Sequence, residues 1–355
     1  MNKHIITEAV DRLYSRIRVL NPQNLAISEY NRNYLVKYID SYSFYMSFYA
    51  QLMLKALDKL EKPISESSFV DYGGGCGMLS YLAKEIGFQT VVYTDIYETS
   101  AIDAQAISKS LDIPVDYFFC GDIDEFMNKL NRNQIKPDLI CSFDVLEHIY
   151  NLDSWIRSIA GINWRFSLLF MTNANSRNPF VQNRLKKLQK IAEYQGTEKR
   201  VGWKDIDLNT SYLEERKSII RNKFPELGNN EIDLLATKSR GLRKSDIEKV
   251  MADYIKTGEF GYKIDHPTNT CDPYTGNWTE RLIDLKQLKS TVRKHNLEVD
   301  IRNSFHVYSN NKLLNTPKYL LNLIIRILGP RNLLFSPTYT LEIQNYVSKP
   351  ALPKR

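Results

Sequence analysis

The amino-acid sequence predicts an α/β protein organised around a parallel sheet. Between residues 63 and 173 short apolar runs alternate with helical patterns, and this alternation requires a parallel sheet covered on both faces. Acidic residues follow the ends of successive predicted strands, which is where open α/β sheets bind their ligands. The chain has 355 residues, of which 43% are hydrophobic and 25% charged, so it is long enough for additional elements around a globular core.

The first predicted strand runs directly into a glycine-rich loop. Phe69 and Val70 favour a strand, the loop extends from Gly73 to Gly77, and the apolar spacing of residues 78–86 predicts a helix. The first N–H groups of a helix have no partners within it, so this loop presents hydrogen-bond donors to a polar ligand. The spacing fits neither the G-x-G-x-x-G pattern of dinucleotide-binding proteins nor a phosphate-binding loop, which requires Gly-Lys-Ser/Thr.

The remaining elements of the sheet follow in order. Strands are predicted at residues 90–95, 116–120, 138–143, 165–171, 297–308 and 338–347, and helices at residues 99–110, 123–130, 152–160, 282–295 and 317–328. The helix at 317–328 is apolar almost all round but too short to span a bilayer. It packs against the sheet, which is the commoner arrangement, or lies on a membrane surface.

Two helical regions flank this core. An N-terminal lid is predicted over residues 1–62, with helices at 5–20 and 33–60, and its aromatic stripe either packs in the core or lines an acceptor pocket. A polar, lysine-rich helical insertion is predicted over residues 174–270, and the core resumes over residues 271–355. Because the insertion leaves the sheet at its ligand-binding edge, it predicts a substrate cap.

Four motifs in the core, over roughly residues 65–175, resemble those of the class I S-adenosylmethionine (SAM) dependent methyltransferases. The matching residues are Asp71, Gly73, Gly75 and Gly77 in the loop, Asp95 and Ile96 after the second strand, Asp122 and Ile123 after the third, and Phe143 and Asp144 after the fourth. The resemblance implies a Rossmann-like seven-stranded sheet closed by an antiparallel pair, with SAM as the cofactor. It implies that Asp95 binds the ribose hydroxyls and that Asp122 contacts the adenine.

The segment from Asp144 to His148 resembles the Asp-x-Leu-Glu-His sequence of many members of that family. Three roles for His148 stay open: a structural or capping residue, the general base for a hydroxyl acceptor, or a metal ligand with Asp144 and Glu147. The chain has no match for the further histidines of the small-RNA 2′-O-methyltransferases, so no metal is predicted.

A second candidate site is the loop at residues 266–281. Its polar and aromatic residues follow the insertion, and we predict that His266 acts in catalysis while Trp278, Glu280 and Arg281 bind the acceptor. The alternative is a rigid loop in which Trp278 is simply packed.

The predicted function is SAM-dependent methyl transfer, to oxygen, on a small-molecule or saccharide acceptor. The general organisation of the chain resembles bacterial methyltransferases of surface-polysaccharide synthesis. One alternative is an RNA methyltransferase, although the basicity of the insertion does not by itself indicate nucleic acid. The other is a non-catalytic binding module that retains the fold.

Charge and cysteine content bear on location. The net charge is +7, and residues 312–355 contain seven Lys or Arg against one acid. This tail predicts a neighbouring membrane surface or polyanion, or else it is simply solvated. The four cysteines show neither metal nor disulfide spacing, and no secretory signal is apparent. We therefore expect a cytoplasmic protein, with peripheral contact at the inner face of the membrane as a further expectation.

Overall fold

The computed structural model describes residues 2–196, 210–308 and 315–345, and the chain divides into two compact units. The first unit comprises residues 1–146, 152–173 and 286–355, and the second comprises residues 147–151 and 174–285. The sequence placed the end of the insertion at residue 270, whereas the second unit continues to Leu285. Within the second unit the Asn269 side chain explains this continuation, because its oxygen accepts from the Leu282 N–H and its amino group donates to the Leu282 carbonyl.

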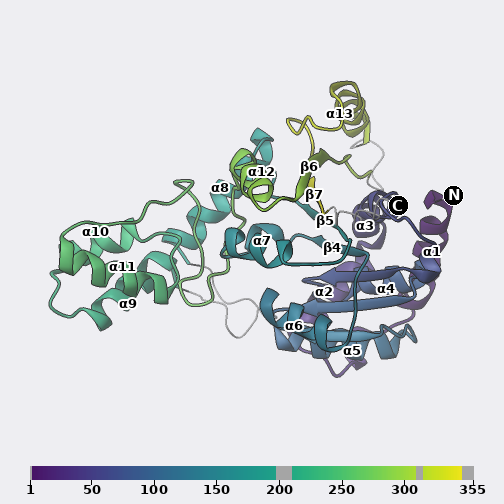
Figure 1. Ribbon diagram of the computed structural model, residues 1–355, viewed down its shortest axis with the longest axis horizontal. Helices are drawn as coiled ribbons and strands as arrows, with labels where there is room; N and C mark the ends of the chain where they lie inside the picture. Colours follow the sequence, from purple (N-terminus) through teal and green to yellow (C-terminus); the bar gives the residue numbers. More distant parts are fainter. Residues whose placement is uncertain (1, 197–209, 309–314, 346–355) are drawn as a thin grey trace, which may run out of the picture. The chain divides into compact units, whose positions relative to one another are not determined.

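The first unit is built on a seven-stranded sheet with the order β3-β2-β1-β4-β5-β7-β6 (Figure 1). The strands are β1 (Ser68–Tyr72), β2 (Thr90–Asp95), β3 (Tyr117–Cys120), β4 (Leu139–Phe143), β5 (Ser167–Thr172), β6 (Glu298–Asn303) and β7 (Tyr339–Gln344). The first five are parallel, and β7 is antiparallel to both β5 and β6. The Rossmann-like seven-stranded class I methyltransferase sheet is thereby confirmed.

The two last strands are shorter than predicted. The chain leaves the β6 ladder after Asn303 because Ser304 bonds to side chains instead, its N–H donating to the Ser336 hydroxyl at 2.9 Å. At the other end, residues 346 and 347 of the predicted last strand lie outside the described residues.

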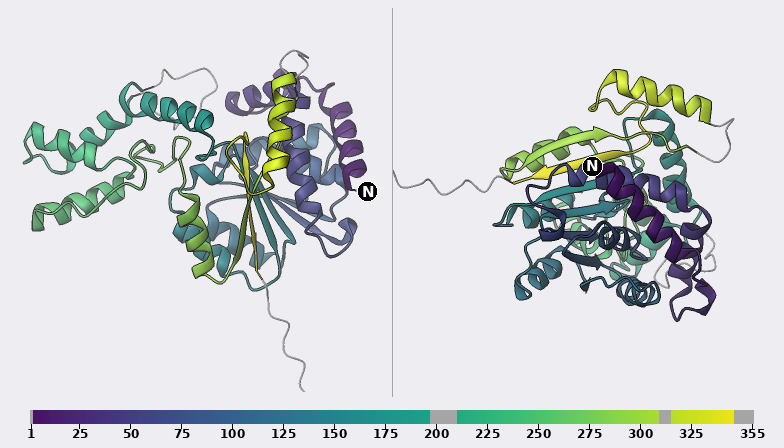
Figure 2. Two further views of the ribbon diagram at one scale, coloured as in Figure 1. Left: turned by 90° about the horizontal axis from the view of Figure 1, so that it is seen from above. Right: turned by 90° about the vertical axis from the view of Figure 1, so that its right-hand side faces the viewer.

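Helices cover both faces of the sheet. Those of the first unit are α1 (Asn2–Ile17), α2 (Glu29–Asp40), α3 (Tyr42–Leu57), α4 (Met78–Ile86), α5 (Glu98–Ser110), α6 (Ile123–Arg132), α7 (Leu152–Ala160), α12 (Leu285–Lys294) and α13 (Asn315–Leu328). Successive side chains of a strand point to opposite faces. Phe69 of β1 accordingly joins the core formed with α1, α3 and α4, whereas Tyr72 contacts Phe126 and Trp155 of α6 and α7 on the other face. Helix α13 lies at the periphery of this unit (Figure 2).

The N-terminal helices belong to the core of the first unit. Leu13 of α1 and Leu52 of α3 are fully buried in the same cluster as Phe69, and Tyr42 and Tyr49 are each only 5% exposed. The predicted lid is therefore an integral layer of this unit, and much of its aromatic stripe is core packing.

The second unit is helical, as the sequence pattern of the insertion predicted. It contains α8 (Pro179–Tyr194), α9 (Tyr212–Lys223), α10 (Asn229–Lys238) and α11 (Lys244–Thr257). A small apolar core that includes Ile220 and Met251 joins α9, α10 and α11. Beside it Arg216, fully buried, donates to both carboxylate oxygens of Glu193 at 2.6 and 3.2 Å.

Across the ranges 2–196, 210–308 and 315–345, no helix combines the length and apolar character needed to cross a membrane.

Candidate functional site

The glycine loop lies where the strand order of the sheet reverses. β1 pairs with β2 on one side and β4 on the other, and such a switch point opens a crevice at the carboxyl ends of the strands. The loops after β1 and β4 approach each other closely there. A Cβ at Gly73 would lie 2.5 Å from Cγ2 of Val145, and Gly73 has a φ of +72°. Both the space and the backbone conformation therefore require glycine at this position.

Asp71, predicted to bind cofactor, supports the loop from within. The N-cap of α4 is Gly77, which has no side chain to cap the helix, and Asp71 takes over that role. Its Oδ2 accepts from the Ser80 N–H at 3.0 Å and from the Ser80 hydroxyl at 2.8 Å. Burial raises the pKa of Asp71 to about 7, against the opposing effect of the bonds from Ser80. Asp71 is only 2% exposed, so the structure makes it a positioning residue.

Gly75 and Asp95 form the exposed part of the same loop. Asp95 Oδ2 accepts from the Gly75 N–H at 3.0 Å, and Oδ1 accepts from the Tyr97 N–H at 2.9 Å. The Tyr93 hydroxyl donates to the Gly75 carbonyl at 2.6 Å. A Cβ at Gly75 would meet no atom within 4 Å. The loop is thus fixed on one side and open at Gly75, where a ligand can lie against the backbone.

The next predicted cofactor residues present apolar surface beside this opening. Ile96 directly follows Asp95 and is 73% exposed, and Ile123 is half-buried at the start of α6. An exposed apolar side chain next to a carboxylate fits a nucleoside, whose base is apolar on its faces and whose ribose donates hydrogen bonds. The exposed Asp122 caps α6 through Oδ1, which accepts from the N–H groups of Asp124 and Glu125. With the open position at Gly75, these residues fit SAM.

Phe143, at the end of β4, is packed against the aromatic stripe of the N-terminal helices, for which the sequence left open core packing or the lining of an acceptor pocket. Its ring lies 5.5 Å from that of Phe48 and 5.4 Å from that of Tyr49. The Tyr49 hydroxyl lies 2.8 Å from the Tyr38 hydroxyl, and burial raises the pKa of both phenols well above the usual value. The sequence feature that indicated this cluster was the spacing of the tyrosines in the N-terminal helices. That spacing does not show at which strand end the tyrosines lie.

Asp144 adopts a left-handed backbone conformation, with a φ of +55°. Its carboxylate accepts from the Asn173 N–H at 2.7 Å and from the Asn173 side-chain amide at 2.6 Å. Non-glycine residues in this conformation are concentrated at functional sites, where the surroundings over-determine them. Asn173 was not predicted, although it follows β5 directly and β5 pairs with β4.

In the second unit, His148 is held by the 266–281 loop. Its Nδ1 lies 2.7 Å from the Trp278 carbonyl oxygen. A carbonyl oxygen only accepts, so Nδ1 carries the proton and Nε2 of the neutral ring has the lone pair. This arrangement gives the ring one orientation and leaves the basic nitrogen on its other side.

Trp278 is a packed residue, which corrects the prediction that it stacks on an acceptor. It is 5% exposed, its indole N–H donates to the Tyr150 carbonyl at 3.1 Å, and its ring stacks on that of Tyr150. The guanidinium of Arg281 lies 4.5 Å from the Trp278 ring centroid. Sequence composition marked this loop as ordered but does not distinguish a packed tryptophan from an open one.

His266 supports the loop as well. Its Nδ1 accepts from the Thr268 N–H at 3.3 Å, which occupies the lone pair that a general base would use. Burial and the charge of Lys186 lower the pKa of His266. Arg281 donates to Asp265 at 2.6 Å, and Glu280 has a φ of +48° and is half-buried. The structure therefore brings His148, Trp278 and Arg281 together and gives His266 a structural role.

No group of three His, Cys, Asp or Glu side chains suited to a metal ion occurs in the part of the chain that the structure describes. The described cysteines are free thiols.

The chain is similar to a family model and to several solved structures. A family model described as a methyltransferase domain matches residues 43–189, and no curated protein matches the sequence. Similar solved structures include an S-adenosylmethionine-dependent methyltransferase from Clostridium acetobutylicum, with 12% identity over 88% of this chain and 98% of that one and a TM-score of 0.42. A putative S-adenosylmethionine-dependent methyltransferase from Listeria monocytogenes has 11% identity over 84% and 98% of the two chains and a TM-score of 0.40.

Another similar structure is phosphoethanolamine N-methyltransferase 2 from Haemonchus contortus, in complex with S-adenosyl-L-methionine, with 11% identity over 82% of this chain and 51% of that one and a TM-score of 0.34. The family match covers the glycine loop, Asp95 and Asp144. Residues 43–189 therefore match a methyltransferase domain, and the geometry of the glycine loop with Asp95 and Ile96 fits SAM as the cofactor.

Proposed function

We propose that this protein transfers a methyl group from SAM to a hydroxyl oxygen of a small-molecule or saccharide acceptor. The observation that carries the choice of oxygen is the orientation of His148. The bond between Nδ1 and the Trp278 carbonyl leaves Nε2 as the acceptor nitrogen, and a hydroxyl nucleophile needs such a base.

The residues divide the work between binding and proton removal. SAM supplies a methyl group that is electrophilic because it is attached to a sulfonium. The backbone at Gly75 and the side chains of Asp95 and Ile96 bind the nucleoside part, and the rigid loop fixes its position. Alignment of acceptor and methyl group accounts for most of the rate enhancement in such a displacement. His148 takes the proton of the acceptor hydroxyl.

Ion pairs within the second unit reduce the number of cations that an RNA acceptor could contact. A surface that binds a polyanion presents unpaired cations, because the affinity comes from neutralised phosphates. Five of the 17 Lys and Arg in the described part of this unit are paired with its own carboxylates, namely Arg216, Lys217, Arg240, Arg243 and Arg281. The sequence resemblance to methyltransferases of bacterial surface-polysaccharide synthesis points in the same direction.

The experiment that tests this proposal has two steps. Calorimetric titration of SAM and S-adenosylhomocysteine first measures cofactor binding. Formation of S-adenosylhomocysteine is then measured with panels of saccharides, small phenols and alcohols, amines and short RNAs. Turnover with a hydroxyl acceptor is expected. SAM binding with turnover only on amines or RNA would overturn the proposed acceptor, and binding without turnover on any panel would favour the non-catalytic module.

A further inference from the structure

Helix α13 exposes a broad apolar face. Six of its apolar side chains are between 37% and 75% exposed: Tyr319, Leu320, Leu323, Ile324, Ile327 and Leu328. Their spacing of one, four, five, eight and nine residues places them on one contiguous side of an α-helix. Contiguous apolar surface of this kind is rare on proteins without an interaction partner and marks a binding surface. The helix lies at the outer edge of the first unit (Figure 2).

The opposite side of α13 is attached through a polar residue to the segment that follows β6. Asn322 is 5% exposed, and its side chain accepts from the His306 N–H at 2.7 Å and donates to the His306 carbonyl at 3.0 Å. Ile325 is the buried apolar residue beside it. The helix is therefore inverted relative to an ordinary surface helix, because its polar anchor faces inward and its apolar side faces outward. This orientation is fixed by specific bonds, so the exposed face is a built feature of the fold.

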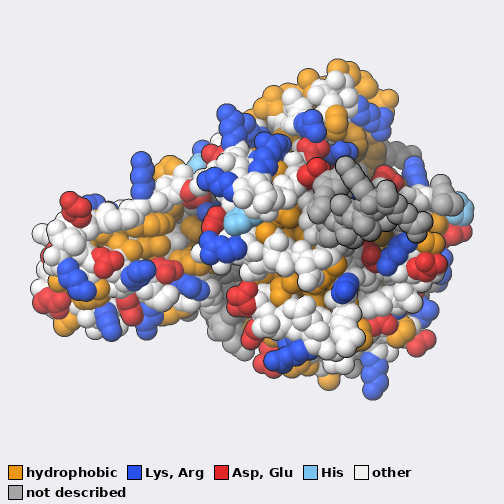
Figure 3. Space-filling model, viewed as in Figure 1, with side chains coloured by type: hydrophobic (Ala, Val, Ile, Leu, Met, Phe, Trp, Pro, Cys, Tyr) orange, Lys and Arg blue, Asp and Glu red, His pale blue; other side chains and the backbone are white. Residues whose placement is uncertain are grey.

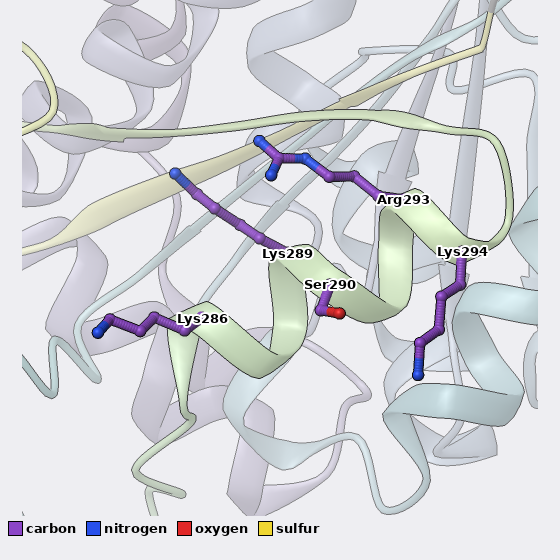
Figure 4. A pocket seen from close by; sticks show the side chains of 5 residues that line it. All are labelled: Lys286, Lys289, Ser290, Arg293 and Lys294. Atoms are coloured by element: carbon purple, nitrogen blue, oxygen red, sulfur yellow. The ribbon is translucent and has the colours of Figure 1, made fainter.

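Cations border this face. Arg326 is exposed at its edge, where the guanidinium lies 5.4 Å from the Phe305 ring centroid, and neither Arg326 nor Lys318 is in an ion pair with any described residue. Helix α12 adds a basic surface, lined by Lys286, Lys289, Ser290, Arg293 and Lys294 (Figure 4). Figure 4 shows Lys289 and Arg293 extending in the same direction from the helix. Figure 3 shows Lys and Arg side chains gathered over α12 next to the hydrophobic side chains over α13.

Three of the α12 cations have no carboxylate partner among the described residues. α12 contains no acidic residue, and within the described part of the chain Lys289, Arg293 and Lys294 form no ion pair with a carboxylate. A second copy of this chain is a poor partner, because a two-fold interface centred on α13 brings like charges together. An anionic lipid surface matches both properties, since headgroups neutralise the cations while the outer acyl region accepts the apolar side chains.

We propose that α13 and the basic face of α12 dock the first unit onto an anionic lipid bilayer. α13 lies in the plane of the interface with Tyr319, Leu323 and Ile327 toward the acyl chains. Lys289 and Arg293 contact the headgroups. This inference is independent of the acceptor and of methyl transfer.

The test is co-sedimentation of the full chain with vesicles of phosphatidylcholine, with and without phosphatidylglycerol. The protein is expected to bind the vesicles that contain phosphatidylglycerol and to dissociate as salt is raised. Ile327→Glu is expected to weaken binding by about tenfold or more, because it replaces a buried apolar contact by a charge. The double variant Lys289→Gln with Arg293→Gln is expected to weaken it by up to about thirtyfold, from the usual contribution of a cation near an anionic surface.

Ile102→Glu is the matched control, because Ile102 lies on α5 of the same unit and is 60% exposed. It is expected to bind as the wild type does, and Tyr319→Glu, as a second variant on α13, is expected to behave as Ile327→Glu. Absence of wild-type binding to anionic vesicles would overturn the proposal. Normal vesicle binding by the α13 variants would also overturn it. So would a wild-type protein that does not bind vesicles but forms a dimer that the α13 substitutions dissociate. Binding of single-stranded RNA, instead of vesicles, by the same cations would overturn it as well.

Discussion

The Asp71 carboxylate lies directly beneath the glycine loop and accepts two hydrogen bonds from Ser80, one from its N–H and one from its hydroxyl. A single buried oxygen thereby joins the end of β1 to the first turn of α4. The motif that suggested a ligand contact at Asp71 is here a means of holding the ligand-binding backbone in place.

Stability is expected to depend on the ionisation of Asp71. Burial raises its pKa from an ordinary value of 3.8 to about 7. Between these two pKa values the folded chain holds a proton on Asp71 that the unfolded chain has released. The contribution of Asp71 to the stability of the fold is therefore complete below the unfolded pKa and is lost as the pH rises through the folded pKa. Between about pH 4 and pH 7 the free energy of unfolding is expected to fall by up to about 1.4 kcal/mol per pH unit from this group. Asp71→Asn removes the titration, and chemical unfolding of both proteins across this range measures the difference. Parallel pH profiles would contradict the assignment.

Alanine substitutions at two neighbouring glycines are expected to affect stability and SAM binding differently. Gly75→Ala adds a methyl group where no protein atom lies within 4 Å, so only the cost of a left-handed alanine, about 1–2 kcal/mol, is expected in unfolding. SAM binding is expected to be lost, because the methyl group occupies the ligand's side of the loop. Gly73→Ala meets Val145 at 2.5 Å and is expected to destabilise the fold further. Unfolding midpoints and SAM calorimetry distinguish the two variants. An unchanged SAM affinity in Gly75→Ala would mean that the cofactor does not bind at this loop.

Asp95→Ala is expected to weaken SAM binding by about tenfold or more, the usual effect of losing hydrogen bonds to a charged acceptor. The substitution also frees the Gly75 N–H from its partner, so part of the loss comes from the loop itself. Asp40→Ala, an exposed acid on α2, is the control and is expected to bind normally. Calorimetry measures the SAM affinity of the wild type and of both variants. Equal affinities would show that Asp95 does not bind SAM.

His148→Gln is expected to lower kcat by about a hundredfold or more while leaving SAM affinity unchanged. The loss is expected to be smallest at high pH, where the acceptor hydroxyl ionises without a base. His4→Gln, at a position whose side chain is 78% exposed, controls for the loss of a histidine. The measurement is kcat and KM against pH with a hydroxyl acceptor that is turned over in the panels described under Proposed function. A kcat equal to that of the wild type would leave His148 with only its structural bond to Trp278.

Arg216→Met is expected to destabilise the second unit by about 3–5 kcal/mol, because it leaves the buried carboxylate of Glu193 without its main partner. Replacing Glu193 by Gln in the same chain is expected to recover part of the loss, since no unpaired charge then remains. Denaturant unfolding followed by far-UV circular dichroism measures both variants. A loss below about 1 kcal/mol would place the pair among weakly contributing ion pairs.

The sequence was most informative where structure depends on local pattern. The strands from Phe69 onward and the glycine loop were predictable because apolar alternation and glycine spacing are local properties. The capping role of Asp71 and the pairing of Asp144 with Asn173 depend on contacts between segments, which spacing alone does not contain. Trp278 was wrongly taken as a binding platform because an ordered loop has the same composition whether its tryptophan is packed or open.

The orientation of α13 could not be read from its composition. The helix is apolar almost all round, which is commoner for a buried helix than for an exposed one. Its single inward-facing amide, Asn322, binds the backbone of His306 and turns the apolar residues outward. The orientation of the helix is thus set by one pair of hydrogen bonds to the segment that follows β6.

The second unit is assembled from two separated pieces of chain, residues 147–151 and 174–285. Within it the Trp278 carbonyl accepts from His148, and the Trp278 indole donates to the Tyr150 carbonyl. A chimera that exchanges only residues 174–285 with a relative would separate His148 and Tyr150 from the tryptophan that orients them. The short pentapeptide and the long insertion must therefore be inherited together, and changes in acceptor specificity through recombination are expected to carry both segments as one evolutionary unit.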